Sequence, residues 1–411
     1  MLTRRAFLQT ATVAAAAPAG EPKRIAILAT VYRPLSQAQH LGDRLLVGYP
    51  WGGAWHRPDI KVSALYVDQK SQGDLSGERA REFGFQVYPT IAEALRCGGK
   101  QLAVDAVLLV AGQGDYASNE KGQVLFPGSD FFQQCVKVFE QDGRAAPVYN
   151  ANQLSYSFEK SKAMVDAAQR LRFPLLAGSS LPVTWRLPAI ELPMGAKIEE
   201  ALMVGGAGEA MDFHALEGLQ CMVERRSGGE TGVKAVQLLE GDAVWKAGDE
   251  GRYSKALLTS ALSRSDTPLG LTEKDGRTQD LVKSGQLQVL AKRPAAYFIE
   301  YRDGCKASVL MLDGAIKDCN FAARLSGVPQ VQSTQFLMTP EPNLTYSACL
   351  MHKVEQMILS GAAPYPVERT LLAGGILESC LTSKVKGHAR VETPHLNVVY
   401  KAPRLSQFAQ A

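Results

Sequence analysis

The segment from 147 to 186 restricts the fold of this chain more than any other part of its sequence. Apolar runs at 148–149 and 175–177 flank the stretch 157–170, in which apolar residues recur at helical spacing. The Phe173–Pro174 step then returns the chain to an extended conformation, because proline disfavours the helical region for the residue before it. The segment is therefore predicted to form a βαβ unit, whose two strands lie parallel.

Polar residues follow both predicted strands of this unit. Asn150 and Asn152 follow the first strand, whereas Ser180, Trp185 and Arg186 follow the second. Ligands of parallel sheets gather outside the carboxyl ends of the strands. These five are therefore the predicted substrate-binding residues, and their polar groups and ring face suit a sugar-like or other small polar ligand.

Three further apolar runs, at 24–29, 60–67 and 104–110, are typical of buried strands in a parallel sheet. We expect them to lie side by side and to point the same way. Together with the βαβ unit they predict a Rossmann-like, doubly wound α/β domain over residues 23–182.

The chain has 411 residues, more than one hydrophobic core usually supports, so a second domain is expected. The composition changes near 183, and strand-like runs follow at 233–239, 296–301, 307–312 and 331–337. Residues 183–400 are therefore predicted to form an α+β domain with a largely antiparallel sheet. A homo-oligomer contact through that sheet is a further expectation.

The order of these elements resembles the Gfo/Idh/MocA oxidoreductases, a family named for glucose-fructose oxidoreductase and inositol dehydrogenase. The phrase PLLAGSSLP at 174–182 is similar to the family's "PLMVGS" strand. At 150–152 this chain has Asn-Ala-Asn where the family has Glu-Lys-Pro, so the lysine that assists proton transfer there is missing. The resemblance implies NAD(P)-dependent oxidation of a CH–OH group, and a last helix, 367–384 here, that packs back on the first domain.

The turn after the first strand bears on the cofactor. A dinucleotide fold has G-x-G-x-x-G here, because glycine lets the pyrophosphate approach the backbone at the start of the helix. Residues 30–35 read Thr-Val-Tyr-Arg-Pro-Leu, and Pro34 lacks an N–H donor. The sequence therefore favours loss or reshaping of a site for NAD or NADP.

Three residues remain candidates for cofactor contact. Thr30 opens that turn, and Gly112 follows the fourth strand, where it permits close backbone approach. Asp68 ends the second strand, where the resemblance implies an acid that binds the adenosine ribose. A helix cap or a structural hydrogen bond is the alternative role of Asp68.

His214 and Asp212 are the predicted catalytic residues. In the family, a helix of the second domain opens with Asp-x-x-x-His, and the histidine reaches the substrate carbinol. Here His214 lies near the start of the predicted helix 211–225, with Asp212 only two residues ahead of it. An imidazole titrates near neutral pH and suits a general base. A packing or capping histidine is the alternative.

Charge and cysteine placement argue against other kinds of site. The formal net charge is only +4 and no Lys/Arg-rich run occurs, which argues against nucleic-acid binding. The seven cysteines form no CxxC pair and have no histidine at ligand spacing, so no metal site is predicted. The segment 48–58 holds two tryptophans and His56, typical of a ligand lid or of a plug at the sheet's end. His352 is expected on a helix face rather than as a ligand.

The first 19 residues resemble a twin-arginine export signal. Arg4 and Arg5 precede an alanine-rich run and a cleavage candidate at 17–19. The run is too short to span a bilayer, so no permanent membrane anchor is expected. These features predict recognition by the twin-arginine export machinery and a periplasmic or extracellular location.

Two functions stay open from the sequence. The first is an exported protein with degenerate cofactor and catalytic motifs that binds a small polar ligand between its domains. The second is an active NAD(P)-dependent oxidoreductase acting on a sugar or polyol. The missing glycines and the missing lysine favour the first.

Overall fold

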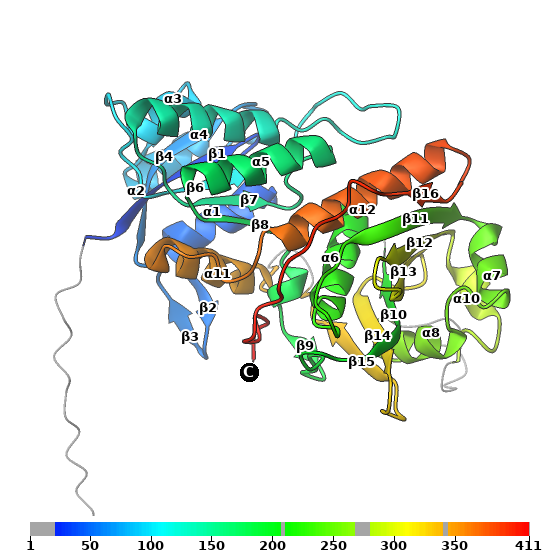
Figure 1. Cartoon of the computed structure of the whole chain (residues 1–411). Helices are drawn as coiled ribbons and strands as arrows, with labels where there is room; N and C mark the ends of the chain where they lie inside the picture. The colour runs from blue at the N-terminus through cyan, green and yellow to red at the C-terminus, as the bar shows by residue number, and fades with distance from the viewer. Residues whose placement is uncertain (1–20, 207–209, 268–279, 340–343, 411) are drawn as a thin grey trace, which may run out of the picture.

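The computed structural model describes residues 21–206, 210–267, 280–339 and 344–410 (Figure 1). The export signal predicted for residues 1–19 lies outside the described residues. Most of the described chain belongs to two large sheets and to the helices that pack on both faces of each sheet. Among the described helices, none combines the length and the apolar character that a bilayer crossing requires.

The first sheet has six parallel strands in the order β5-β4-β1-β6-β7-β8. Their bounds are β1 Lys23–Ala29, β4 Ile60–Val67, β5 Gln86–Val87, β6 Ala106–Val110, β7 Val148–Ala151 and β8 Leu175–Gly178. The strands that end at Ala29, Val67 and Val110 are adjacent and parallel, which confirms the predicted Rossmann-like sheet. β6 is buried along its whole length, which accounts for its unbroken apolar sequence.

Helices cover both faces of this sheet. One buried cluster joins the sheet to α3 (Ile91–Arg96), α4 (Gly128–Asp142) and α5 (Phe158–Leu171). A second cluster joins it to α1 (Gln37–Val47) and α11 (Ser347–Ser360). α2 covers Ser76–Phe83. Because α11 comes from the end of the sequence, part of the range predicted as the second domain folds onto the first sheet (Figure 1).

The segment predicted as a lid or plug is a hairpin. Its strands are β2 (Tyr49–Trp51) and β3 (Ala54–His56), which pair antiparallel, and β2 contacts α11. The hairpin therefore packs against α11, and none of its residues lines the cavity described below.

The second sheet has eight strands in the order β16-β11-β12-β13-β10-β14-β15-β9. β10 pairs parallel with β13 and the other pairs are antiparallel, which confirms the predicted sheet type. The bounds are β9 Arg186–Leu187, β10 Ile198–Gly205, β11 Val233–Glu240, β12 Arg293–Tyr301, β13 Lys306–Asp313, β14 Cys319–Leu325, β15 Gln332–Phe336 and β16 Val391–Glu392.

Described helices pack on both faces of the second sheet. One face holds α6 (Met211–Val223) and α12 (Glu368–Val385), and the other holds α7 (Asp242–Asp249), α8 (Lys255–Leu262) and α10 (Gln286–Leu290). α12 also contacts α5 of the first domain. The homo-oligomer contact through this sheet stays a prediction, and it would have to involve these covering helices.

Candidate functional site

A cavity of about 340 Å³ lies at the carboxyl ends of β6 and β7, where the first domain faces α6 and α12. Its polar wall includes Asn150, Asn152, Asp212, Lys121, Gln123 and Tyr156, and apolar residues such as Phe126, Phe213 and Leu377 complete it. The cavity thus lies at the strand ends that the sequence indicated. The long connection from β6 to α4 extends toward α12 (Figure 1), and Lys121 on it forms an ion pair with Glu378 of α12 at 3.0 Å.

Asn150 presents an unpaired acceptor at the cavity. The residue is 1% exposed, and its Nδ2 donates to the carbonyls of Ala151 and Gln153 at 3.2 and 3.0 Å. These two carbonyls require the amide nitrogen on that side, so the orientation of the carboxamide is fixed. Within the described residues its buried Oδ1 accepts no hydrogen bond. Leaving a buried acceptor unpaired costs about 1–3 kcal/mol, and because this oxygen is closed off from solvent, a ligand would reach it only after the cavity wall moved.

Asn152 and Gly112 lie together beside the start of α1. Asn152 has a φ of 60°. Its side-chain carboxamide exchanges two hydrogen bonds with the side-chain carboxamide of Gln37, at 2.9 and 3.2 Å. A Cβ at Gly112 would lie 3.3 Å from Asn152 Nδ2 and 3.4 Å from Gln37 Oε1. Glycine at 112 therefore leaves room for the amide pair, and both predicted residues line the cavity.

Asp212 places a carboxyl group in the cavity wall. It lies in the first turn of α6, and Tyr297 of β12 donates a hydrogen bond to its Oδ2 at 2.5 Å. Burial raises the pKa of Asp212, although the hydrogen bond from Tyr297 opposes that shift. The predicted residue is therefore available to bind or to exchange a proton with a ligand in the cavity.

His214 contacts the end of β8 and is not among the residues that line the cavity. Its Nδ1 lies 2.7 Å from Ser179 Oγ, which also accepts a hydrogen bond from the amide of Leu181 at 3.0 Å. Burial lowers the pKa of His214 to about 4, so the imidazole is neutral at neutral pH. His214 thus takes the packing role that the sequence left open, and the predicted catalytic pair does not form because Asp212 bonds to Tyr297 instead.

The first turn of α1, where a pyrophosphate would bind, is filled by side chains of the chain itself. Gln113 Oε1 accepts a hydrogen bond from the backbone N–H of Gln37 at 2.8 Å. Ser36 Oγ accepts from the amide of Gln39 at 3.2 Å, and Gln39 Oε1 accepts from the amide of Leu35 at 3.1 Å. These amides are the donors that a helix start offers to an anion.

The loop that follows β6 and contains Gln113 also contacts the residues that follow β4. Asp68 accepts hydrogen bonds from the hydroxyls of Tyr66 and Tyr116 at 2.9 and 2.7 Å. Gln69 exchanges two hydrogen bonds with the backbone of Asp115, each at 3.0 Å. Asp68 therefore makes structural hydrogen bonds, which was the alternative to its predicted contact with the adenosine ribose.

Thr30 is buried, and its backbone pairs with Val110 and Gln69. With the start of α1 also filled, the residues at this edge do not fit a dinucleotide held in the way that the resemblance implies.

The other predicted substrate residues lie elsewhere. Arg186 is 5% exposed, lies between the rings of Phe336 and Phe408, and donates to the carbonyls of Pro182 and Ile190. It is a buried cation with structural contacts and is not among the residues that line the cavity. Chain order misled the prediction here, because the residue already belongs to the edge strand β9 of the second sheet.

Ser180 and Trp185 are also absent from the cavity wall. Ser180 precedes a short 3₁₀ helix, Leu181–Val183, and its carbonyl accepts from the amides of Val183 and Thr184. Trp185 packs against the cluster under α11, and its carbonyl accepts from the amide of Leu337. The cavity uses Gln123 and Tyr156 instead, which come from loops whose course the sequence did not indicate.

No family model and no curated protein matches this sequence. Solved structures do match across nearly the whole chain. GenD2 from gentamicin A biosynthesis, in complex with NAD, is 13% identical, covers 93% of this chain and 99% of its own, and has a TM-score of 0.56. A putative myo-inositol dehydrogenase from Sinorhizobium meliloti is 11% identical, with coverages of 90% and 99% and a TM-score of 0.53.

A myo-inositol dehydrogenase from Corynebacterium glutamicum is likewise 11% identical, with coverages of 90% and 98% and a TM-score of 0.52. At these identities the likeness establishes the fold. The chain has the two-domain fold of Gfo/Idh/MocA-type dehydrogenases, as the sequence resemblance implied.

Proposed function

We propose that this chain is an exported protein of the Gfo/Idh/MocA fold that no longer uses a dinucleotide and that binds a small polyhydroxyl ligand in the interdomain cavity. The hydrogen bond from the Gln37 amide to Gln113 carries the proposal, since it occupies the first-turn position that the cofactor's pyrophosphate would need.

Admitting a dinucleotide would disrupt several contacts at once. The loop would have to release Gln37 from Gln113, Asp68 from Tyr116, and Gln69 from Asp115. At about 1 kcal/mol for each of these four hydrogen bonds, opening costs on the order of 4 kcal/mol, or roughly 10³-fold in affinity. The proline at 34 also lacks a backbone N–H that could bind a pyrophosphate.

The cavity suits a ligand with several hydroxyl groups. Asn152 offers an amide and Asp212 a carboxyl group, while Phe126 supplies apolar ring surface. Alternating polar groups and ring faces are what a sugar or cyclitol contacts. The volume of about 340 Å³ falls in the range of small-molecule sites.

An NAD(P)-dependent oxidoreductase acting on a sugar or polyol is the second candidate. The position of Asp212 favours it, because a carboxyl group with a raised pKa in a cavity is suited to proton transfer. The similar structure of GenD2 holds NAD. Against this candidate stand the filled first turn of α1 and the Asn-Ala-Asn at 150–152, which lacks the lysine of the family's Glu-Lys-Pro.

Thermal unfolding in the presence of candidate ligands tests the proposal. We expect myo-inositol or a hexose to raise the Tm of the chain, whereas NAD and NADP leave it unchanged. Asp212→Asn should reduce the polyol effect. Asp166→Asn, which alters an exposed carboxylate on α5, is the matched control and should keep it. A Tm raised by a dinucleotide, or a dinucleotide released when the purified chain is denatured, would support the oxidoreductase instead.

A further inference from the structure

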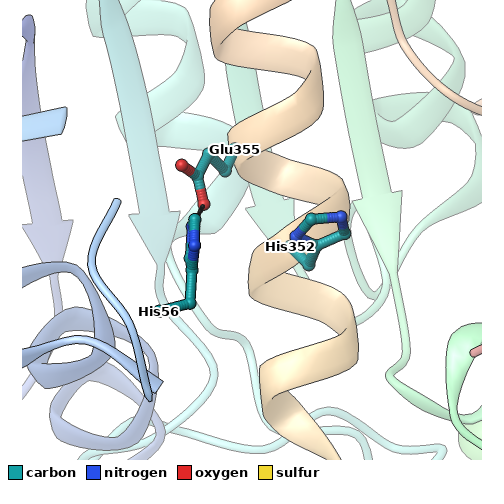
Figure 2. Close-up of side chains that lie close together, drawn as sticks. All are labelled: His56, His352 and Glu355. Atoms are coloured by element: carbon teal, nitrogen blue, oxygen red, sulfur yellow. Dashed lines mark hydrogen bonds and ion pairs between the residues drawn. The ribbon is translucent and has the colours of Figure 1, made fainter. Parts of the chain in front are cut away.

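A second group of polar side chains lies on α11 and the β2–β3 hairpin, away from the cavity. Figure 2 shows the ring of His56 directed at the carboxylate of Glu355, with His352 one turn away on the same helix. His56 Nε2 lies 2.7 Å from Glu355 Oε2. One ligand atom from each of the three residues lies within 4.8 Å of the others.

The carboxylate of this group is buried with little positive charge to balance it. The side chain of Glu355 is 5% exposed, and within the described residues its one ion pair is with His56. Lysine and arginine, the usual partners of a buried carboxylate, do not fill that role here.

Surrounding residues hold the three side chains in place. Tyr49 donates to Glu355 Oε2 at 2.5 Å, and the amide of Asp59 donates to Oε1 at 3.3 Å. The ring of Trp51 stacks on His352 with 4.0 Å between ring centroids. Gln356 Nε2 lies 3.2 Å from His352 Nε2, which leaves His352 Nδ1 to face the cluster. Contacts of this kind orient ligands in metal sites.

We propose that His56 Nε2, His352 Nδ1 and Glu355 Oε2 bind a divalent first-row transition-metal ion of the Zn²⁺ type. Two imidazoles and a carboxylate are a common ligand set for such an ion, with water in the remaining position. Ligand bonds of about 2.0–2.1 Å in a tetrahedral site separate the ligand atoms by roughly 3.3 Å. On binding, His352 would therefore move inward, and His56 Nε2 and Glu355 Oε2, which lie 2.7 Å apart, would move apart to admit the ion.

Tyr49 has a supporting part in this site. Its hydroxyl donates to Glu355 Oε2 and lies 3.4 Å from His352 Nδ1, so it contacts two of the three proposed ligands. The bound ion would tie the hairpin to α11. The sequence did not indicate this site, because His56 and Glu355 are 299 residues apart and have no motif spacing.

Metal titration of the full-length chain, purified without a polyhistidine tag and stripped with EDTA, tests the site. The Cys97→Ser background removes the one partly exposed thiol among the free cysteines. We expect Co²⁺ to bind in a single equivalent with visible d–d absorption, and Zn²⁺ to displace it. His56→Gln, His352→Gln and Glu355→Gln should each lose this binding, and Tyr49→Phe should weaken it by roughly 10–100-fold.

His395→Gln is the matched control, since His395 is a histidine outside this cluster and contacts Ser379. It should bind Co²⁺ like the parent chain. Absence of stoichiometric Co²⁺ binding by the folded parent chain would overturn the proposal, whatever the stability of the variants. Unchanged binding by all three ligand variants would also overturn it, and would assign the signal to another site.

Discussion

The side chain of Gln113 accepts a hydrogen bond from the backbone amide of Gln37 at 2.8 Å, across the carboxyl ends of β1 and β6. In a dinucleotide-binding domain this amide belongs to the helix start that holds the pyrophosphate. Here the chain supplies its own acceptor. The fold of a dehydrogenase is thus retained while its anion site is used for internal contacts.

Replacing Gln113 with alanine removes that acceptor. The Gln37 amide then depends on water, and we expect the free energy of unfolding to fall by about 0.5–1.5 kcal/mol. Urea unfolding at an unchanged m-value measures this loss. Gln101→Ala changes an exposed glutamine and should stay within about 0.5 kcal/mol of the parent. Equal losses in the two variants would show that Gln113 has no special role.

Glu217 on α6 is a buried carboxyl group whose pKa burial raises to about 7. Thr370 Oγ1 lies 2.5 Å from Glu217 Oε1 and 3.0 Å from the carbonyl of Ala177, yet a hydroxyl has a single proton to donate. A protonated Glu217 satisfies both contacts, since it donates to Thr370 while Thr370 donates to Ala177. The geometry thus agrees with the direction of the shift.

This raised pKa predicts how stability depends on pH. The folded-state pKa of Glu217 lies above its ordinary value of 4.5. The contribution of protonated Glu217 to the free energy of unfolding is therefore fully present below about pH 4.5 and is lost as the pH rises through about 7. The shift corresponds to a change on the order of 3 kcal/mol. Glu217→Gln keeps a donor for Thr370 and should flatten the decline in unfolding free energy between about pH 5 and pH 8.

Urea unfolding at these two pH values measures the effect. Glu159→Gln, an exposed acid on α5, should keep the decline of the parent. If Glu217→Gln also keeps it, Glu217 titrates normally in the folded chain.

Arg369 and Glu224 form a buried ion pair between α12 and the end of α6. Their side chains are 3% and 1% exposed, and two hydrogen bonds of 2.9 and 2.6 Å join them. Arg369→Met leaves an unpaired buried carboxylate, and we expect it to lower the free energy of unfolding by about 3–5 kcal/mol. Adding Glu224→Gln should recover part of that loss. A double-mutant cycle measures the coupling, and strictly additive losses would argue against a direct pair.

The export proposal rests on Arg4 and Arg5. Replacing both with lysine should hold the chain in the cytoplasm of a bacterium with a twin-arginine route, because the receptor reads the arginine pair. Cell fractionation measures the distribution, and the parent chain should reach the periplasm with its first 19 residues removed. Export of the lysine variant at the parent's level would point to another route.

The sequence predicted the fold well because buried parallel strands leave a plain mark on it. The buried residues of the runs that became β1 and β6 are apolar without alternation, and the βαβ unit around α5 indicates a parallel sheet. Placing residues at strand ends also found Asn150, Asn152 and Gly112 in the cavity wall, whereas Asp212 was predicted from its helix position through the family resemblance.

The remaining site residues depend on tertiary contacts that spacing does not encode. Arg186 looked available for substrate, but the edge strand β9 and two aromatic rings enclose it. Gln113 caps a helix that starts 76 residues earlier, and nothing in its local sequence indicates this. His214 has the expected helix position, but its ring faces Ser179 rather than the cavity.

Titration of the purified chain with NADH, followed by nicotinamide fluorescence and repeated with NADPH, tests the central claim most directly. We predict no saturable binding up to about 1 mM, because the Gln113 loop occupies the first turn of α1. Saturable binding with a Kd below about 100 μM would contradict the account. It would mean that the loop opens at little cost and that the oxidoreductase alternative holds.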